Sequence, residues 1–315
     1  MEGAYYNGQY LNRLERLGYS QAEIDNKLES TFEEMFYGPE GVRLCHCAGP
    51  DMMYIEDTGN HDVRTEGMSY AMMFCVQMNR QKEFDCLWRW VVTHMYLTEG
   101  ENAGYFAWSC HTDGSKNSDG PAPDGEEFFA MSLFFAANRW GSGEGVLDYA
   151  SWARRILHAC VHKGEEAGSG FPMWNPENHL IKFIPNCEFT DPSYHLPHFY
   201  ELFALWSDEC DHPFWHAAAA ASRQYLRKAC HVRTGLSAEY AEYDGRPHRG
   251  DQPDRHDWFF SDAYRTLGNI ALDAQWFGDK DGWAHETAAH IQQFFEEKEH
   301  GQTNGIYLID GTTVE

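Results

Sequence analysis

Three acidic side chains, Glu66, Asp124 and Asp262, each stand at the start of a predicted helix that follows a long loop. A carboxyl group at a helix start is normally ionised, because the helix dipole and a cation such as Arg64 favour the charged form. Enzymes that need a carboxylic acid as a proton donor overcome this preference by burial and by a second carboxylate nearby. The three acids are therefore candidates for a site of acid–base chemistry.

Each acid also has a simpler interpretation, which the sequence leaves open. An acid in the first turn of a helix often complements the helix dipole at the protein surface. Asp124 is also a plausible N-cap residue, because it directly precedes Gly125 and two glutamates. Burying three acids within four residues would be costly unless they share a task.

Helices are the elements that would position these acids. A capping box formed by Ser20 and Glu23 begins a helix that Gly38 ends. Ser261 is expected to cap a later helix that ends at about Trp276. Apolar residues at helical spacing predict eight further helices, over about 66–79, 82–97, 125–138, 149–163, 196–208, 213–229, 261–276 and 283–298.

The connections between these helices alternate between short links and long loops over 98–125, 164–193 and 231–257. This alternation is typical of an α/α toroid, in which the long loops gather at one end and form the site. In such a ring the helix starts that carry the three acids face that same end. Nine helices is an odd number for a fold built from pairs, and residues 306–315 contain no helix cap. We therefore expect a single all-α domain over residues 1–315 that is incomplete at its C-terminus.

The composition limits the possible partners. The chain has 24 basic and 49 acidic residues, a net charge of −25, which disfavours nucleic acid and anionic membrane surfaces. Aromatic residues make up 15% of the chain, and several lie in predicted loops, such as Tyr105–Trp108 and Pro172–Trp174. Loop aromatics beside carboxylates suit sugar rings and hydroxyls, although the same residues could simply cover the core.

The sequence predicts a cytoplasmic protein. The N-terminus lacks the basic and apolar regions of a secretory signal, and no stretch approaches the roughly 20 apolar residues of a membrane span. The nine cysteines are an odd number and fall mostly in helical patterns, which favours free thiols in a reducing compartment.

Neither a metal ion nor another cofactor is expected. Cys45-His-Cys47 is short and lacks a clear second pair of ligands. His285 and His290 are five residues apart, so a helix turns them off a common face. Gly141–Gly145 follows no predicted strand and is therefore not a phosphate-binding loop, and the chain has no G-x-S-x-G motif.

Five segments resemble glycoside hydrolase family 8. Two of them, Asp62–Met73 and Ala122–Leu133, look like the acid-bearing segment and the second signature of that family. Three more, Tyr105–Ser109, Asp191–Tyr200 and Phe259–Arg265, resemble its reducing-end xylose-releasing exo-oligoxylanases. The likeness covers nearly the whole chain and rests on separate motifs.

The resemblance implies an (α/α)6 barrel and an inverting hydrolysis that releases xylose from the reducing end of β-1,4-xylo-oligosaccharides, xylotriose or longer. Carried over by motif, Glu66 is the general acid, Asp262 the general base, and Asp124 a contact to the sugar at subsite −1. Inversion needs room for a water molecule, so we expect the acid and base carboxyl groups about 6.5–9.5 Å apart. The resemblance implies further sugar contacts from Arg64, Trp108, Tyr194 and Arg265.

Exo-specificity is implied by the resemblance alone. Members of that family continue beyond the length of this chain through helices that close the barrel, and in its exo-oligoxylanases the same tail carries a histidine loop that makes them exo-acting. Two alternatives therefore stay open. One is an endo-acting hydrolase of the same family on xylan, chitosan or β-glucan. The other is a non-catalytic sugar-binding protein, which would not need both an acid and a base.

Overall fold

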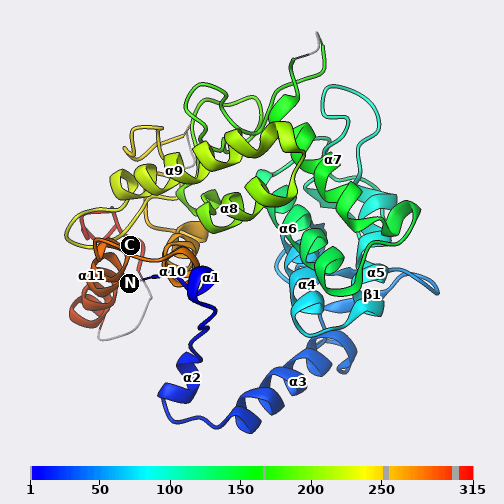
Figure 1. Cartoon of the computed structure of the whole chain (residues 1–315), viewed down its shortest axis with the longest axis horizontal. Coiled ribbons are helices and arrows are strands. Elements are labelled where there is room, and N and C mark those ends of the chain that lie inside the picture. The colour runs from blue at the N-terminus through cyan, green and yellow to red at the C-terminus, as the bar shows by residue number, and fades with distance from the viewer. Residues whose placement is uncertain (1, 166–167, 251–254, 300–304, 315) are drawn as a thin grey trace. The chain divides into compact units, whose positions relative to one another are not determined.

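The computed structural model describes the chain except for residues 1, 166–167, 251–254, 300–304 and 315 (Figure 1). Small parts of the second and third predicted loops lie outside the described residues. The chain divides into two compact units. We call them the N-terminal unit, Tyr10–Cys160 with Gly164–Gly170, and the C-terminal unit, Met1–Gln9 with Val161–Lys163 and Phe171–Glu315.

The N-terminal unit is mainly helical. Its core contains a cluster of three buried rings, Trp88, Phe106 and Phe129, with centroids 5.1–5.9 Å apart. Within this unit α4 packs against both α5 and α6 (Figure 1). Its helices are α2 (Arg13–Arg16), α3 (Gln21–Tyr37), α4 (Thr65–Gln77), α5 (Gln81–Trp90), the π-helix η1 (Val91–Met95), α6 (Pro123–Trp140), the 3-10 turn η2 (Gly145–Leu147) and α7 (Tyr149–His162), of which the last two residues belong to the C-terminal unit.

Two small antiparallel sheets lie in the same unit. Strand β1 (Cys45–Cys47) pairs with β2 (Met53–Ile55). Strand β3 (Val63–Arg64) pairs with β4 (Ser109–Cys110), which places Arg64 opposite Ser109. The second pair joins the segment that leads into α4 to the long loop before α6.

The C-terminal unit contains a second group of helices. Helix α8 packs against α9, and α10 packs against α1, α8 and α11 (Figure 1). A buried apolar cluster that includes Leu226 and Ile270 joins α9 to α10. The elements are α1 (Ala4–Asn7), α8 (Pro197–Trp206), α9 (His212–Ala229), α10 (Arg265–Phe277), α11 (Trp283–Glu299) and the 3-10 turns η3 (Pro192–Tyr194), η4 (Glu209–Asp211) and η5 (Ser261–Tyr264).

The predicted helices are confirmed. Nine helices of ten or more residues fall within the described part of the chain, each over a predicted range. The capping box is also present: Glu23 Oε2 accepts from the Ser20 backbone N–H at 2.8 Å, and Ser20 Oγ accepts from the Glu23 N–H at 3.3 Å.

The helix predicted over 82–97 is wrong beyond Trp90, where it becomes the π-helix η1. Val91 and Val92 are β-branched, which lowers their α-helix propensity. In addition, Thr93 Oγ1 donates to the Arg89 carbonyl oxygen at 2.7 Å and competes with the backbone for it.

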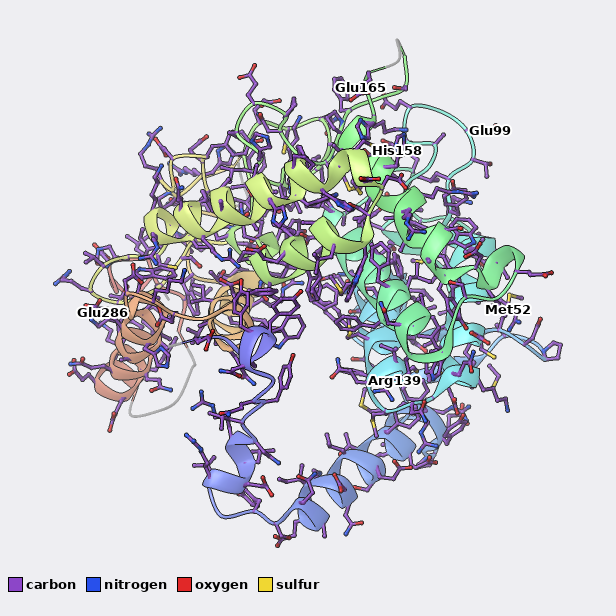
Figure 2. The ribbon with its side chains drawn as sticks, viewed as in Figure 1. Met52, Glu99, Arg139, His158, Glu165 and Glu286 are labelled. Atoms are coloured by element: carbon purple, nitrogen blue, oxygen red, sulfur yellow. The ribbon has the colours of Figure 1, made fainter. Side chains whose placement is uncertain are left out.

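The surface reflects the acidic composition. Among the acidic side chains, Glu99, Glu165 and Glu286 are exposed (Figure 2). In the part of the chain that the structure describes, none of the helices is long and apolar enough to cross a membrane.

Candidate active site

Glu66 lies in the first turn of α4, directly after strand β3. Arg64 is the N-cap residue and has an extended backbone, so the chain turns sharply from strand to helix at this point. The Thr65 N–H donates to the Trp108 carbonyl oxygen at 2.9 Å, which ties the helix start to the long loop. Glu66 is partly buried at this junction of strand, helix and loop.

Asp124 lies in the first turn of α6 and is not its N-cap, which was the alternative interpretation of this residue. The N-cap is Ala122, because Pro123 has a fixed φ that suits the first helical position. Asp124 is only 3% exposed, and its Oδ1 accepts from the Gly125 N–H at 3.0 Å. The carboxyl group is therefore held inside the unit instead of capping the helix in solvent.

The starts of α4 and α6 lie side by side. A Cβ atom added at Gly125 would lie 2.5 Å from Thr65 Cβ, closer than real Cβ contacts allow. Only glycine permits this approach. Glu66 follows Thr65 and Asp124 precedes Gly125, so the structure brings these two candidate acids to the same end of the helix pair.

Glu126 is a buried acid that the sequence did not single out. Its Oε1 accepts from the Phe106 N–H at 3.0 Å, whereas Oε2 has no hydrogen-bond partner among the described residues. Burial raises the pKa of the Glu126 carboxyl to about 8. It therefore carries a proton at neutral pH, which lowers the cost of burial. The dense acidic run 124–127 was the sequence signal for such a group.

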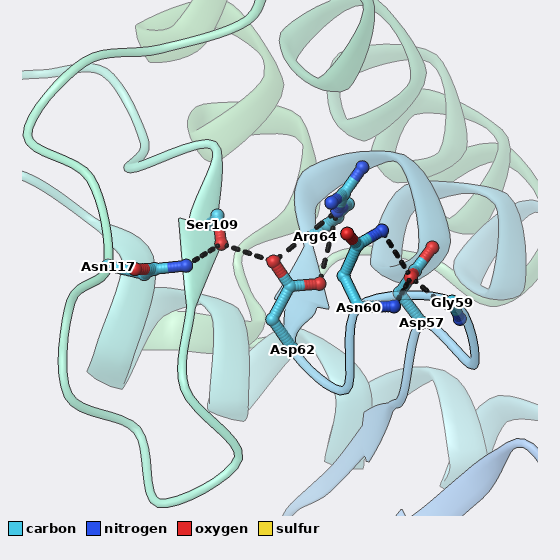
Figure 3. A network of polar contacts seen from close by, with 7 residues as sticks. All are labelled: Asp57, Gly59, Asn60, Asp62, Arg64, Ser109 and Asn117. Carbon is cyan, nitrogen blue, oxygen red and sulfur yellow. Dashed lines mark hydrogen bonds and ion pairs between the residues drawn. The ribbon is translucent and has the colours of Figure 1, made fainter.

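Arg64 is held by a buried acid, Asp62, which is 5% exposed (Figure 3). Arg64 Nε donates to the two Asp62 carboxylate oxygens at 3.1 and 3.4 Å. Ser109 Oγ donates to Asp62 Oδ2 at 2.8 Å, and Asn117 Nδ2 donates to Ser109 Oγ at 2.9 Å. The arginine is thus anchored through a chain of polar contacts from the loop before α6.

Trp108 supplies an exposed aromatic face in this region. Its side chain is 37% exposed, and the Arg64 guanidinium lies 5.1 Å from its ring centroid. Three other aromatics of the predicted loops, Tyr105, Phe106 and Trp174, are buried in the core. Trp108 is therefore exposed as a sugar-binding ring would be, whereas the buried loop aromatics cover the core.

Asp262 lies in the C-terminal unit, in the 3-10 turn η5 that precedes α10. Its side chain is 38% exposed and forms an ion pair with Arg265. The prediction that Ser261 caps a helix is wrong: the N-cap is Phe260 without a side-chain hydrogen bond. Ser261 has φ of 47°, a left-handed conformation that is unusual for serine and turns the chain into the 3-10 turn.

Asp191, which is fully buried, adds a second acid near Asp262. Its Oδ1 accepts from the Ser193 N–H at 2.7 Å. Burial raises the pKa of Asp191 to about 8, with the negative charge of Asp262 adding to the effect and the positive charge of Arg265 opposing it. Asp191 also starts the turn η3 that carries the buried Tyr194.

Glu239 and His256 form a further pair close to Asp262. His256 Nδ1 lies 2.9 Å from Glu239 Oε2, and the His256 ring stacks on Tyr240 with centroids 4.1 Å apart. Burial raises the pKa of Glu239, and the charge of Asp262 contributes in the same direction. Sequence reasoning missed this pair, because the loop that contains it gave no periodic pattern.

The chain belongs to glycosyl hydrolases family 8, whose family model matches residues 19–314. Its members are glycoside hydrolases, and the acids described above all lie within the matched residues.

Known proteins of this family resemble the chain along its length. It is 54% identical over 315 residues to the reducing end xylose-releasing exo-oligoxylanase of Halalkalibacterium halodurans, covering 100% of this chain and 80% of that protein. It is 56% identical over 300 residues to the reducing-end xylose-releasing exo-oligoxylanase Rex8A of Paenibacillus barcinonensis, covering 94% and 77%. A structure of Rex8A complexed with xylose matches with a TM-score of 0.96 and 53% identity, covering 100% of this chain and 82% of that chain.

Proposed function

We propose that this protein is an inverting glycoside hydrolase that releases xylose from the reducing end of β-1,4-xylo-oligosaccharides. The observation that carries the proposal is the identity of 54% over the whole chain to a relative named for that activity. The exposed Trp108 face with Arg64 across it supports a sugar ligand, because sugar rings stack on aromatics and their hydroxyls accept hydrogen bonds.

In the proposed mechanism Glu66 is the general acid and Asp262 the general base. Glycosidic cleavage passes through an oxocarbenium-like transition state, and inversion requires both protonation of the leaving oxygen and activation of a water on the opposite face. The ion pair with Arg265 suits Asp262 to the second role, because a base must carry a negative charge. A separation of about 6.5–9.5 Å between the two carboxyl groups stays a prediction.

Asp124 is proposed to contact the sugar at subsite −1. Its burial beside the start of α4 supports this role, since a buried carboxylate gives a strong, directed hydrogen bond to a sugar hydroxyl. The remaining proposed sugar contacts are Arg64, Trp108, Tyr194 and Arg265.

The test is the digestion of xylotriose labelled at its reducing end. We expect labelled xylose and unlabelled xylobiose as the first products, with the anomeric configuration inverted in proton NMR spectra. The variants Glu66→Ala and Asp262→Asn should each slow release by a factor on the order of 10³. Labelled xylobiose as the main first product, or retained configuration, would contradict the proposal. Early products of mixed length from polymeric xylan would instead indicate an endo-acting hydrolase.

The finer architecture is also a proposal: a single (α/α)6 barrel domain over residues 1–315 whose last helices lie outside this chain. The helical composition and the match of this chain to 82% of a longer relative support it. Cooperative unfolding with a single transition would agree with one domain, whereas two separate transitions would contradict it.

We further propose a cytoplasmic location. All nine cysteines are free thiols, as expected in a reducing compartment. Fractionation of producing cells with an antibody to the chain would test this location, and recovery of the protein outside the cells would contradict it.

A further inference from the structure

We propose that Asp62 is a positioning residue that fixes the Arg64 guanidinium over Trp108, with its terminal nitrogens available to the hydroxyl groups of a bound sugar. The inference rests on the proposed function, in which Arg64 and Trp108 contact the substrate. It assigns to Asp62 an effect on substrate binding that is exerted entirely through Arg64.

The contact between the two side chains is specific. Arg64 Nε donates to both carboxylate oxygens of Asp62, at 3.1 and 3.4 Å (Figure 3). Among the described residues, no hydrogen-bond partner is found for the two terminal nitrogens of Arg64. Because the guanidinium is planar and rigid, holding Nε fixes the direction in which the terminal nitrogens point.

The Asp62 carboxylate is itself fixed from the opposite strand. Ser109 Oγ donates to it at 2.8 Å, and Ser109 lies opposite Arg64 in the β3–β4 pair. Asn117 Nδ2 donates to the same Ser109 hydroxyl at 2.9 Å, and the Asn117 N–H donates to the Ser109 carbonyl oxygen at 3.1 Å. Ser109 directly follows Trp108, so the contacts that hold Arg64 come from the chain that also holds the tryptophan ring.

The charges explain why an acid is needed here. Asp62 is buried and Arg64 is three-quarters buried, with 7% and 25% of their side chains exposed. A buried carboxylate without a cation would be costly, and so would a guanidinium without an anion. Paired with Asp62, Arg64 presents hydrogen-bond donors with little net charge, which suits uncharged hydroxyl groups. Asparagine would keep the shape of Asp62 but lose this charge pairing.

The test is a double-mutant cycle on xylotriose cleavage, with Asp62→Asn, Arg64→Ala and the double variant. We expect Asp62→Asn to raise KM roughly tenfold and to change kcat less, as for the loss of one charge-assisted contact. If Asp62 acts through Arg64, the double variant should be no weaker than Arg64→Ala alone. Additive losses would overturn the inference, because they would indicate two independent roles.

The matched control is Asp113→Asn. Asp113 is exposed in the same long loop and accepts from the Ser115 N–H and Oγ, at 2.9 and 2.6 Å. This variant should retain the KM of the original chain, and an equal rise in KM for both asparagine variants would overturn the inference. If Asp62→Asn fails to fold, Ser109→Ala removes one bond to the carboxylate and should raise KM roughly threefold. An unchanged KM in that variant would then contradict the inference.

The proposed function and the inference fail in different ways. If the unmodified chain cleaves xylotriose but the effects of Asp62→Asn and Arg64→Ala on KM are additive, only the inference is contradicted. An unmodified chain that neither cleaves xylotriose nor binds it in isothermal titration calorimetry contradicts the proposed function, and removes the sugar contact on which the inference rests.

Discussion

Arg64 and Arg265 each lie within three residues of a proposed catalytic acid, yet they pair with different partners. Arg265 forms its ion pair with Asp262, the proposed base. Arg64 is bound by Asp62, an acid without a proposed chemical step. The difference matches the two roles. A base must be ionised before the reaction, and a cation on it favours that state. A proton donor needs no such cation, and the arginine two residues before Glu66 is bound by Asp62.

The strongest test of this comparison is to replace the two acids in parallel. We expect Glu66→Gln and Asp262→Asn each to lower kcat on xylotriose by a factor on the order of 10³, since each removes one proton transfer. A xylobioside with a phenolic leaving group of low pKa needs little protonation, so it should restore the rate of Glu66→Gln only. Initial rates of the two variants on the two substrates test this. If Glu66→Gln is as slow on the phenolic xylobioside as on xylotriose, the assignment of Glu66 as the acid is contradicted.

The next effect concerns the cation on the base. We expect Arg265→Met to lower kcat by about 10–100-fold with a smaller change in KM, because Asp262 loses its buried partner. The control is Arg246→Met, since Arg246 forms an exposed pair with Asp244 at 2.7 Å and exposed pairs contribute little. Steady-state kinetics of both variants test this expectation. A loss of similar size in Arg246→Met would show that any lost ion pair in this unit lowers the rate.

A smaller effect is expected from separating the starts of α4 and α6. Gly125→Ala places a Cβ about 2.5 Å from Thr65 Cβ, and should reduce the free energy of unfolding by about 1–3 kcal/mol and lower kcat/KM. Gly268→Ala is the matched control in α10, where an added Cβ meets nothing within 4 Å. It should stabilise the chain by about 0.5–1 kcal/mol. Urea unfolding measures both, and equal shifts would contradict the close approach.

The last prediction concerns the effect of one buried acid, Glu126, on the pH dependence of stability. Burial raises the pKa of Glu126 from 4.5 to about 8, so between these values the folded chain keeps a proton that the unfolded chain has lost. Stability should therefore fall as pH rises through this window, by at most about 1.4 kcal/mol per pH unit. Glu126→Gln should remove this part of the slope, measured by urea unfolding from pH 5 to pH 8. The exposed Glu297→Gln is the control, and an unchanged slope in Glu126→Gln would contradict the prediction.

The placement of the acids could largely be predicted from the sequence. Glu66, Asp124 and Asp262 all stand at the starts of helical elements, because apolar periodicity and loop length are local properties of the chain. Family membership was also predicted correctly, since it rests on contiguous motifs.

The capping of two of these starts and the partners of the acids could not be predicted. Proline at position 123 moved the start of α6 ahead of Asp124, and a left-handed Ser261 replaced the expected cap. The sequence suggested Arg64 as a cation near Glu66, but not that Asp62 binds it, because that contact is set by tertiary pairing with Ser109. Burial of Glu126 is likewise a property of packing, and composition alone does not reveal which acid of a cluster is enclosed.

The path of the chain between its two units has a practical consequence for dissecting the protein. The chain passes from one unit to the other after Gln9, Cys160, Lys163 and Gly170. Each unit is therefore assembled from separated stretches of sequence, and a single proteolytic cut would leave at least one of them divided between two fragments. The C-terminal unit cannot be exchanged between homologues as one continuous cassette, so chimaeras that replace it need several junctions or a circular permutation.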